Sequence, residues 1–136
     1  MSTVLTVGHS NKPVGQFLHL LQGAGVQTVW DIRSRPYSRW NPQFNRERLR
    51  ESLQTVGISY QYWGDRLGGL DGNSDPEGAL DELASSHRTV IMCSEGDPAN
   101  CHRRTWVTPG LVARGCNVLD LLWSGEIVDT QTGQLF

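Results

Sequence analysis

Short apolar runs alternate with segments of helical periodicity along the chain, and this alternation constrains the fold more than any other feature of the sequence. Five runs have the apolar or β-branched composition of strands, at residues 4–7, 28–32, 58–63, 89–93 and 117–123. Strands that alternate with helices join through right-handed crossovers into a parallel sheet covered on both faces. The sequence therefore predicts an α/β fold, a Rossmann-like three-layer sandwich with a mainly parallel five-stranded sheet. We expect one domain over residues 1–129, followed by a C-terminal tail at 130–136.

The segments between the runs carry apolar stripes with recognisable ends. Phe17, Leu20 and Leu21 recur at helical spacing after Pro13, which suits a first turn, and before Gly25, which suits a helix end. Equivalent stripes lie at Leu49, Leu53 and Val56 before Gly57, and at Leu80, Leu83 and Ala84 after Asp75-Pro76-Glu77. Thr108-Pro109 either begins another helix or kinks a longer one, and the pattern fits both.

Composition narrows the class of protein. The chain has 136 residues, 38% of them hydrophobic, which suffices for one core. No stretch reaches the roughly 20 apolar residues of a membrane helix, and the first residues lack a secretory signal pattern, so we expect a cytoplasmic protein without a membrane partner. The odd set of three cysteines, Cys93, Cys101 and Cys116, indicates reduced thiols rather than a disulfide framework.

Charge is unevenly distributed although the formal net charge is only −2. Six arginines and one glutamate occupy residues 33–50, whereas residues 71–97 are acidic with Arg88 as their one cation. This balance excludes a globally basic DNA-binding surface and leaves a local anion site open.

Polar residues cluster where the predicted strands end. They are His9 and Ser10 after the first strand, Asp31 and Arg33 at the second, residues 67–69 after the third, and residues 93–104 after the fourth. Parallel sheets bind ligands beyond the carboxyl ends of their strands, because loops and helix amino termini converge there. We therefore expect these residues to share one cleft.

Those same residues carry a family resemblance. The chain resembles the family called Domain of Unknown Function 488, in blocks at residues 6–10, 31–33, 41–45, 67–69, 92–95 and 101–104. The resemblance implies the α/β architecture, and the family has no settled activity that could be transferred. Two departures are the pair Pro109-Gly110 in the final helix and a short loop at residues 71–74.

Phosphate recognition is the preferred ligand hypothesis, because guanidinium groups bind phosphate through paired hydrogen bonds and keep their charge. The ligand would be a nucleotide, a phosphorylated small molecule or a nucleic-acid end. The predicted ligand-binding residues are Ser10, Arg33, Arg35, Cys101, His102, Arg103 and Arg104. The alternative is that Arg33 pairs with Asp31 or Glu95 and only holds the loops together.

An enzyme-like domain would add reactive groups to this anion site, and the predicted catalytic residues are His9, Asp31, Cys93 and Glu95. Cys93 would be a nucleophile stabilised by His102, with Cys101 as a resolving thiol in redox chemistry. The phosphatase loop is absent, because Ala99 stands where that signature places an arginine. The alternative for His9 is a helix cap, and for Glu95 an acceptor of loop amides.

A metal-supported hydrolase is a further hypothesis, since Cys93, Cys101 and His102 could ligate zinc with His9 or Asp31. Seven residues separate the two cysteines and no Cys-x-x-Cys pair is present, so the spacing favours inert packing of Cys93. We expect no metal, and the sequence names no cofactor.

The runner-up function from another class is a non-catalytic module that binds nucleic acid or nucleotides. Residues 33–50 interleave six arginines with Tyr37, Trp40 and Phe44, a mixture that grips a phosphate backbone and stacks bases. The alternative is that Arg46, Arg48 and Arg50 form the solvated face of a helix.

Overall fold

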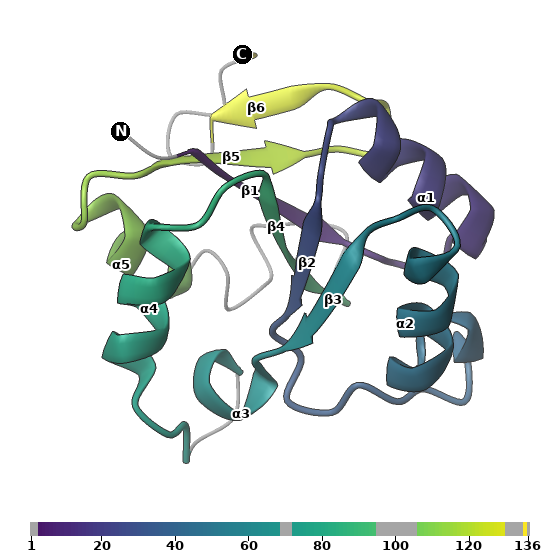
Figure 1. Ribbon diagram of the computed structural model, residues 1–136, viewed down its shortest axis with the longest axis horizontal. Coiled ribbons are helices and arrows are strands. Elements are labelled where there is room, and N and C mark those ends of the chain that lie inside the picture. The colour runs from purple at the N-terminus through teal and green to yellow at the C-terminus, as the bar shows by residue number, and fades with distance from the viewer. Residues whose placement is uncertain (1–2, 69–71, 95–105, 130–134, 136) are drawn as a thin grey trace.

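A computed structural model describes residues 3–68, 72–94, 106–129 and 135 (Figure 1). Its strands are β1 (Thr3–Gly8), β2 (Thr28–Asp31), β3 (Ser59–Tyr62), β4 (Thr89–Cys93), β5 (Asn117–Leu121) and β6 (Ile127–Asp129). Its helices are α1 (Val14–Gly23), the 3-10 turn η1 (Pro42–Phe44), α2 (Arg46–Gln54), α3 (Gly64–Leu67), α4 (Pro76–Ala84) and α5 (Thr108–Val112). The α/β fold and the five predicted strands are confirmed.

The strands form one sheet in the order β3-β2-β4-β1-β5-β6. All pairs among β1 to β5 are parallel, and β6 pairs antiparallel with β5. The prediction of five strands was therefore one short. The missed strand β6 has three residues and follows a turn at Gly125, whose φ is +89°, and so short a run leaves no period in the sequence.

The order of the strands explains why helices cover both faces. From β1 to β2 to β3 the chain moves toward one edge of the sheet, and from β3 to β4 to β5 it moves back. Right-handed crossovers in opposite directions place their helices on opposite faces. Accordingly, α1 and α2 cover one face and α4 and α5 the other (Figure 1).

Each face has its own hydrophobic core. Phe17, Leu21 and Leu49 belong to the cluster beneath α1 and α2, whereas Leu80 and Leu111 belong to the cluster beneath α4 and α5. β4, whose five residues are all buried, lies between β2 and β1 at the centre of the parallel part of the sheet. This is the position expected for a strand that is nearly all apolar.

The helix ends follow the chemistry expected from the sequence. Gly25 follows α1 with a φ of +72°, in the left-handed region that glycine adopts without strain. Asp75 caps α4 by accepting a hydrogen bond of 3.1 Å from the backbone N–H of Gly78. Pro109 is the second residue of the short helix α5, after a π-type turn at Trp106 and Val107.

Two sequence-based expectations concern segments that lie wholly or partly outside the described residues. These are the tail at 130–134 and the loop at 71–74, of which residue 71 is not described. Within the described parts of the chain, no helix has the length and apolar character needed to cross a membrane.

Candidate functional site

At the carboxyl end of β4, the connections that follow the strands change from one face of the sheet to the other. β4 has β1 on one side and β2 on the other. The chain leaves both neighbours toward α1 and α2, whereas after β4 it returns as α5 on the opposite face. Divergence of this kind marks the usual ligand position in open α/β sheets.

Backbone hydrogen bonds tie the loops at this point to β4. The N–H of His9 donates to the carbonyl of Cys93 at 2.9 Å, and the N–H of Ser10 donates to the carbonyl of Ser94 at 2.9 Å. Ser10 has a φ of +52°, a left-handed conformation that costs energy for a residue other than glycine. The backbone hydrogen bonds between β1 and β4 therefore continue past the end of β1 and hold Ser10 in a strained turn.

A buried ion pair lies beside these loops. The guanidinium of Arg33 binds Asp31 through two parallel bonds, from Nε to Oδ1 at 2.9 Å and from Nη2 to Oδ2 at 2.7 Å. The backbone N–H of Arg33 also donates to Oδ1 of Asp31, at 3.1 Å. Arg33 is 5% exposed and Asp31 is fully buried. Burial alone would lower the pKa of Arg33, but the hydrogen bonds and charge of Asp31 outweigh it and raise the pKa.

His9 contacts Nη1 of Arg33, the guanidinium nitrogen that does not bind Asp31. Its Nδ1 lies 2.6 Å from the carbonyl oxygen of Ser10, and its Nε2 lies 3.3 Å from Nη1 of Arg33. A carbonyl can only accept and a guanidinium can only donate, so the neutral tautomer with its proton on Nδ1 satisfies both contacts. Burial, followed by the charge of Arg33, lowers the pKa of His9 to about 4. His9 is therefore neutral at physiological pH.

Two aromatic residues support this arrangement. The ring of Phe44 stacks on His9 with a centroid distance of 4.3 Å, and the hydroxyl of Tyr60 donates to Oδ2 of Asp31 at 2.5 Å. Burial, followed by the negative charge of Asp31, raises the pKa of Tyr60. We call His9, Asp31, Arg33 and Tyr60 the buried network. Tyr60 was missed in the sequence, where the alternation of Tyr60 and Tyr62 in β3 was the available signal.

Cys93 does not join the buried network. Its side chain is 3% exposed and belongs to the core beneath α4 and α5, with Ile91 and Leu111. His9 stacks on Phe44, which belongs to the core on the other face. The sheet thus separates Cys93 from the imidazole that was expected to share a cleft with it.

A second buried polar pair lies on the same face as Cys93. The hydroxyl of Thr6 in β1 donates to the carboxylate of Asp120 in β5, its register partner. Asp120 is 5% exposed. The sequence analysis assigned no functional role to either residue, because both lie within the apolar patterns of predicted strands.

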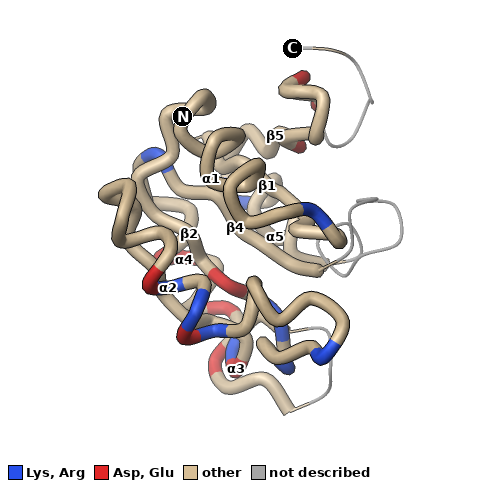
Figure 2. The backbone as a smooth tube through the Cα atoms, turned by 90° about the vertical axis from the view of Figure 1, so that its right-hand side faces the viewer, with Lys and Arg blue, Asp and Glu red and all other residues tan. Residues whose placement is uncertain are grey.

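The segment after Arg33 is largely exposed, in contrast to the buried network. We call residues 35–50 the basic segment; it runs from the loop after β2 into α2, and Figure 2 colours Lys and Arg blue along the backbone. Tyr37 and Trp40 are 56% and 83% exposed. Arg35, Arg39, Arg48 and Arg50 are exposed, and Arg46 lies over the ring of Tyr62 at 4.5 Å. Among the described residues, none of these arginines lies within ion-pair distance of a carboxylate.

Several predicted site residues lie outside the described residues. They are Glu95, Cys101, His102, Arg103 and Arg104. The hypotheses of a zinc site, a resolving thiol and an arginine pair in this loop therefore stay predictions. Within residues 3–68, 72–94, 106–129 and 135, no group of three or more His, Cys, Asp or Glu residues could hold a metal ion.

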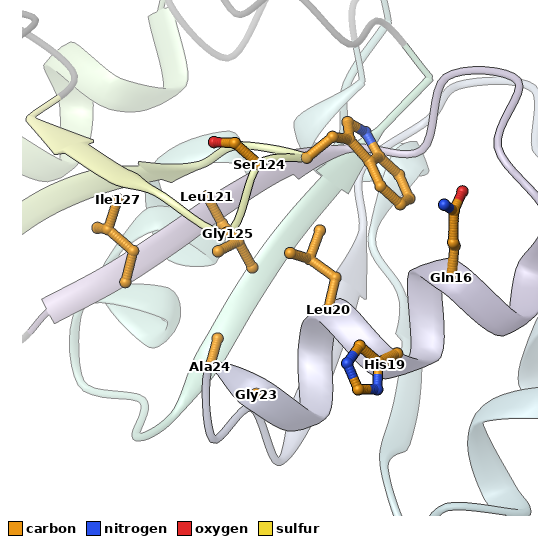
Figure 3. A pocket seen from close by; sticks show the side chains of 10 residues that line it. Gln16, His19, Leu20, Gly23, Ala24, Leu121, Ser124, Gly125 and Ile127 are labelled. Atoms are coloured by element: carbon orange, nitrogen blue, oxygen red, sulfur yellow. The ribbon is translucent and has the colours of Figure 1, made fainter.

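A pocket of about 380 Å³ lies apart from the buried network, between α1 and the turn that joins β5 to β6 (Figure 3). Its walls carry Gln16, His19 and Leu20 from α1, and Trp123 and Ile127 from the β5–β6 hairpin. The polar side chains at its rim, Gln16, His19 and Ser124, are exposed. The pocket has the size of a ligand site but holds no buried polar group.

Comparison with known protein families gives a match. The model of the family described as Domain of unknown function DUF488 matches residues 13–78. This range contains Asp31, Arg33, Tyr60 and the whole basic segment, whereas His9 and Cys93 lie outside it. No curated protein and no solved structure gives a significant match.

Proposed function

The chain belongs to the family described as Domain of unknown function DUF488, and because that description names no activity, we propose a function from the site itself. The domain binds phosphate-bearing ligands through the arginines of the basic segment. Suitable ligands are a nucleotide, a phosphorylated small molecule or a nucleic-acid end.

The contrast in ion pairing among the arginines carries this proposal. Arg33, Arg66 and Arg114 each bind a carboxylate, at N···O distances of 2.7, 3.1 and 2.5 Å. The five arginines of the basic segment have no such partner among the described residues. Their charges are available to a ligand, and a guanidinium recognises phosphate with two parallel hydrogen bonds.

Arg33 contributes to the basic segment mainly by holding the start of that segment in place. Asp31 and His9 engage three of its five N–H groups. The bonds hold the chain rigidly where it leaves β2 and enters the basic segment. Arg35 begins that segment two residues later and is exposed, so it is the first arginine that a ligand can reach.

Catalysis has weaker support than binding. Both ring nitrogens of His9 are hydrogen-bonded, Asp31 is fully buried, and Cys93 is buried on the other face. None of these three presents a reactive atom to the basic segment. The prediction that they, with Glu95, act on the bound ligand remains a prediction.

Calorimetric titration with inorganic tripolyphosphate at low salt tests the proposal. The variant Arg35→Gln/Arg39→Gln is compared with Arg88→Gln, which removes an exposed arginine at the amino end of β4. We expect the double variant to lose at least about tenfold in affinity, the loss of one charge-assisted hydrogen bond or more, and Arg88→Gln to bind as the wild type does. Absence of tripolyphosphate binding, or equal affinity of both variants, would contradict the proposal.

A further inference from the structure

We propose that the ligand of the basic segment is a single-stranded nucleic acid, whose bases stack on Tyr37 and Trp40 while the neighbouring arginines bind its phosphates. This inference rests on the proposed function, because it names the ligand class for the same surface. Stacking together with backbone contacts is how proteins bind single strands without reading their sequence.

The exposure of the two aromatic rings is the first observation. Among the described residues, the exposed large hydrophobic side chains are Tyr37, Trp40 and Leu135. Two of the three therefore fall within one stretch of four residues. An indole that is 83% exposed is not stabilised by burial in the core. Its contact with water is unfavourable, so a partner that covers the ring would gain binding free energy.

The charge around these rings is the second observation. Arg39 lies over the ring of Trp40, 5.5 Å from its centroid, and Arg35 precedes Tyr37 by two residues. Cations thus alternate with aromatic faces along the chain, as phosphates alternate with bases along a strand. A duplex would use the cations but hide its base faces from both rings.

The turn that carries the rings is held by its own hydrogen bonds. The hydroxyl of Ser38 accepts from the N–H groups of Trp40 and Asn41, both at 3.1 Å. The side chain of Asn45 accepts from the N–H of Ser38 at 2.8 Å, and the hydroxyl of Tyr37 donates to Glu47 at 2.8 Å. A platform ordered before binding loses less conformational entropy when a strand docks.

Fluorescence anisotropy with labelled 12-nucleotide probes tests the inference, using oligo(dT), oligo(U) and a blunt duplex of the same length. We expect at least one single strand to bind at least about tenfold more tightly than the duplex. We expect Trp40→Ala and Tyr37→Ala each to lose about 5- to 150-fold in affinity, the range for removing one stacked base. Trp40→Phe keeps a ring and should bind close to wild type. Leu135→Ala, the matched control, removes an exposed hydrophobic residue outside the segment and should have no effect.

The outcomes separate this inference from the proposed function. Binding of oligo(dT) alone, oligo(U) alone or both supports the inference and identifies the sugar that is accepted. If tripolyphosphate binds through Arg35 and Arg39 but the duplex binds as well as both single strands, or the alanine variants bind normally, the inference is wrong and phosphate recognition stands. If no polyanion binds, both fail.

Discussion

Arg33 and Arg35 are two residues apart and of the same type, yet the fold uses them in opposite ways. Arg33 is 5% exposed and is held by Asp31 and His9, whereas Arg35 is exposed and has no carboxylate within ion-pair distance among the described residues. A guanidinium neutralised inside the protein builds the scaffold, and one left unneutralised in water is available to a partner. The buried network and the basic segment extend this contrast to whole regions.

The buried network stabilises the loops only while it is complete. Removing two charges from water is costly, and their attraction repays that cost only with good geometry and further hydrogen bonds. Asp31 meets this condition, because Arg33 binds it through both side-chain and backbone groups and Tyr60 donates to it as well. Loss of Asp31 would leave the guanidinium of Arg33 and the hydroxyl of Tyr60 without their carboxylate partner.

The largest expected effect therefore comes from Asp31→Ala. This change leaves the guanidinium of Arg33 buried without a counter-charge, which typically costs about 3–5 kcal/mol. Arg35→Ala is the matched control, since surface substitutions usually stay within about 0.5 kcal/mol. Urea unfolding followed by circular dichroism measures both free energies.

A second variant keeps this prediction testable if Asp31→Ala does not fold. Asp31→Leu combined with Arg33→Met replaces both charges with apolar groups, so the double variant should recover much of the lost free energy of unfolding. If Asp31→Ala were as harmless as Arg35→Ala, the buried network would not be the scaffold described above.

The pH dependence of stability gives the next largest effect. The pKa of His9 falls from 6.5 to about 4 on folding, so between these values the unfolded chain binds a proton that the folded chain does not. Stability from this group is present above pH 6.5 and is lost as the pH falls to 4, by about 3 kcal/mol. The basic segment contributes no histidine to this change.

Comparison with His9→Gln isolates this contribution, because a glutamine amide oxygen can still accept from Arg33. The wild type should lose about 3 kcal/mol more than His9→Gln between pH 7 and pH 4. His19→Gln, which removes an exposed imidazole, controls for the loss of a histidine. Parallel pH profiles of the wild type and His9→Gln would show that the imidazole already titrates in the folded protein as it does in the unfolded chain.

The sequence predicted the edge of the sheet where His9, Asp31 and Arg33 meet, but not which face each residue occupies. His9, Asp31 and Arg33 come together because strand ends in a parallel sheet share one edge. Cys93 was placed with them because the same rule applies to β4. All five residues of β4 are buried, so no polar alternation reveals which side chains point to which face.

The sequence offered the pairing of Arg33 with Asp31 only as an alternative to phosphate binding, and no pattern in it decided between the two. Six arginines between residues 33 and 50 look alike in composition, and only the geometry separates Arg33 from the rest. Tyr60 reaches Asp31 from the neighbouring strand, and such a contact depends on strand order and register. Neither is encoded in a local pattern.

Tyr60→Phe tests the outer part of the buried network with a smaller effect. It removes the hydroxyl that donates to Asp31 and keeps the ring. Because Tyr60 is only half-buried, we expect a loss of about 1–2 kcal/mol in the free energy of unfolding, toward the lower end for a hydrogen bond to a charged group. Tyr62→Phe is the matched control, since its hydroxyl donates to the backbone carbonyl of Ser34 at 3.1 Å. An equal effect of the two variants would show that the hydrogen bond from Tyr60 to Asp31 stabilises the fold no more than the one from Tyr62 to the Ser34 carbonyl.

The smallest expected effect on stability belongs to the residue with the largest expected effect on binding. Trp40 is 83% exposed, so Trp40→Ala should change the free energy of unfolding by no more than about 0.5 kcal/mol. Phe44→Ala is the comparison within the same segment, because its ring is fully buried beneath His9, and such a loss costs about 3–5 kcal/mol. Urea unfolding of both variants, beside the anisotropy measurement on Trp40→Ala, decides the point. A large destabilisation by Trp40→Ala would mean that the indole packs against the protein, and loss of oligonucleotide binding in that variant could then no longer be assigned to stacking.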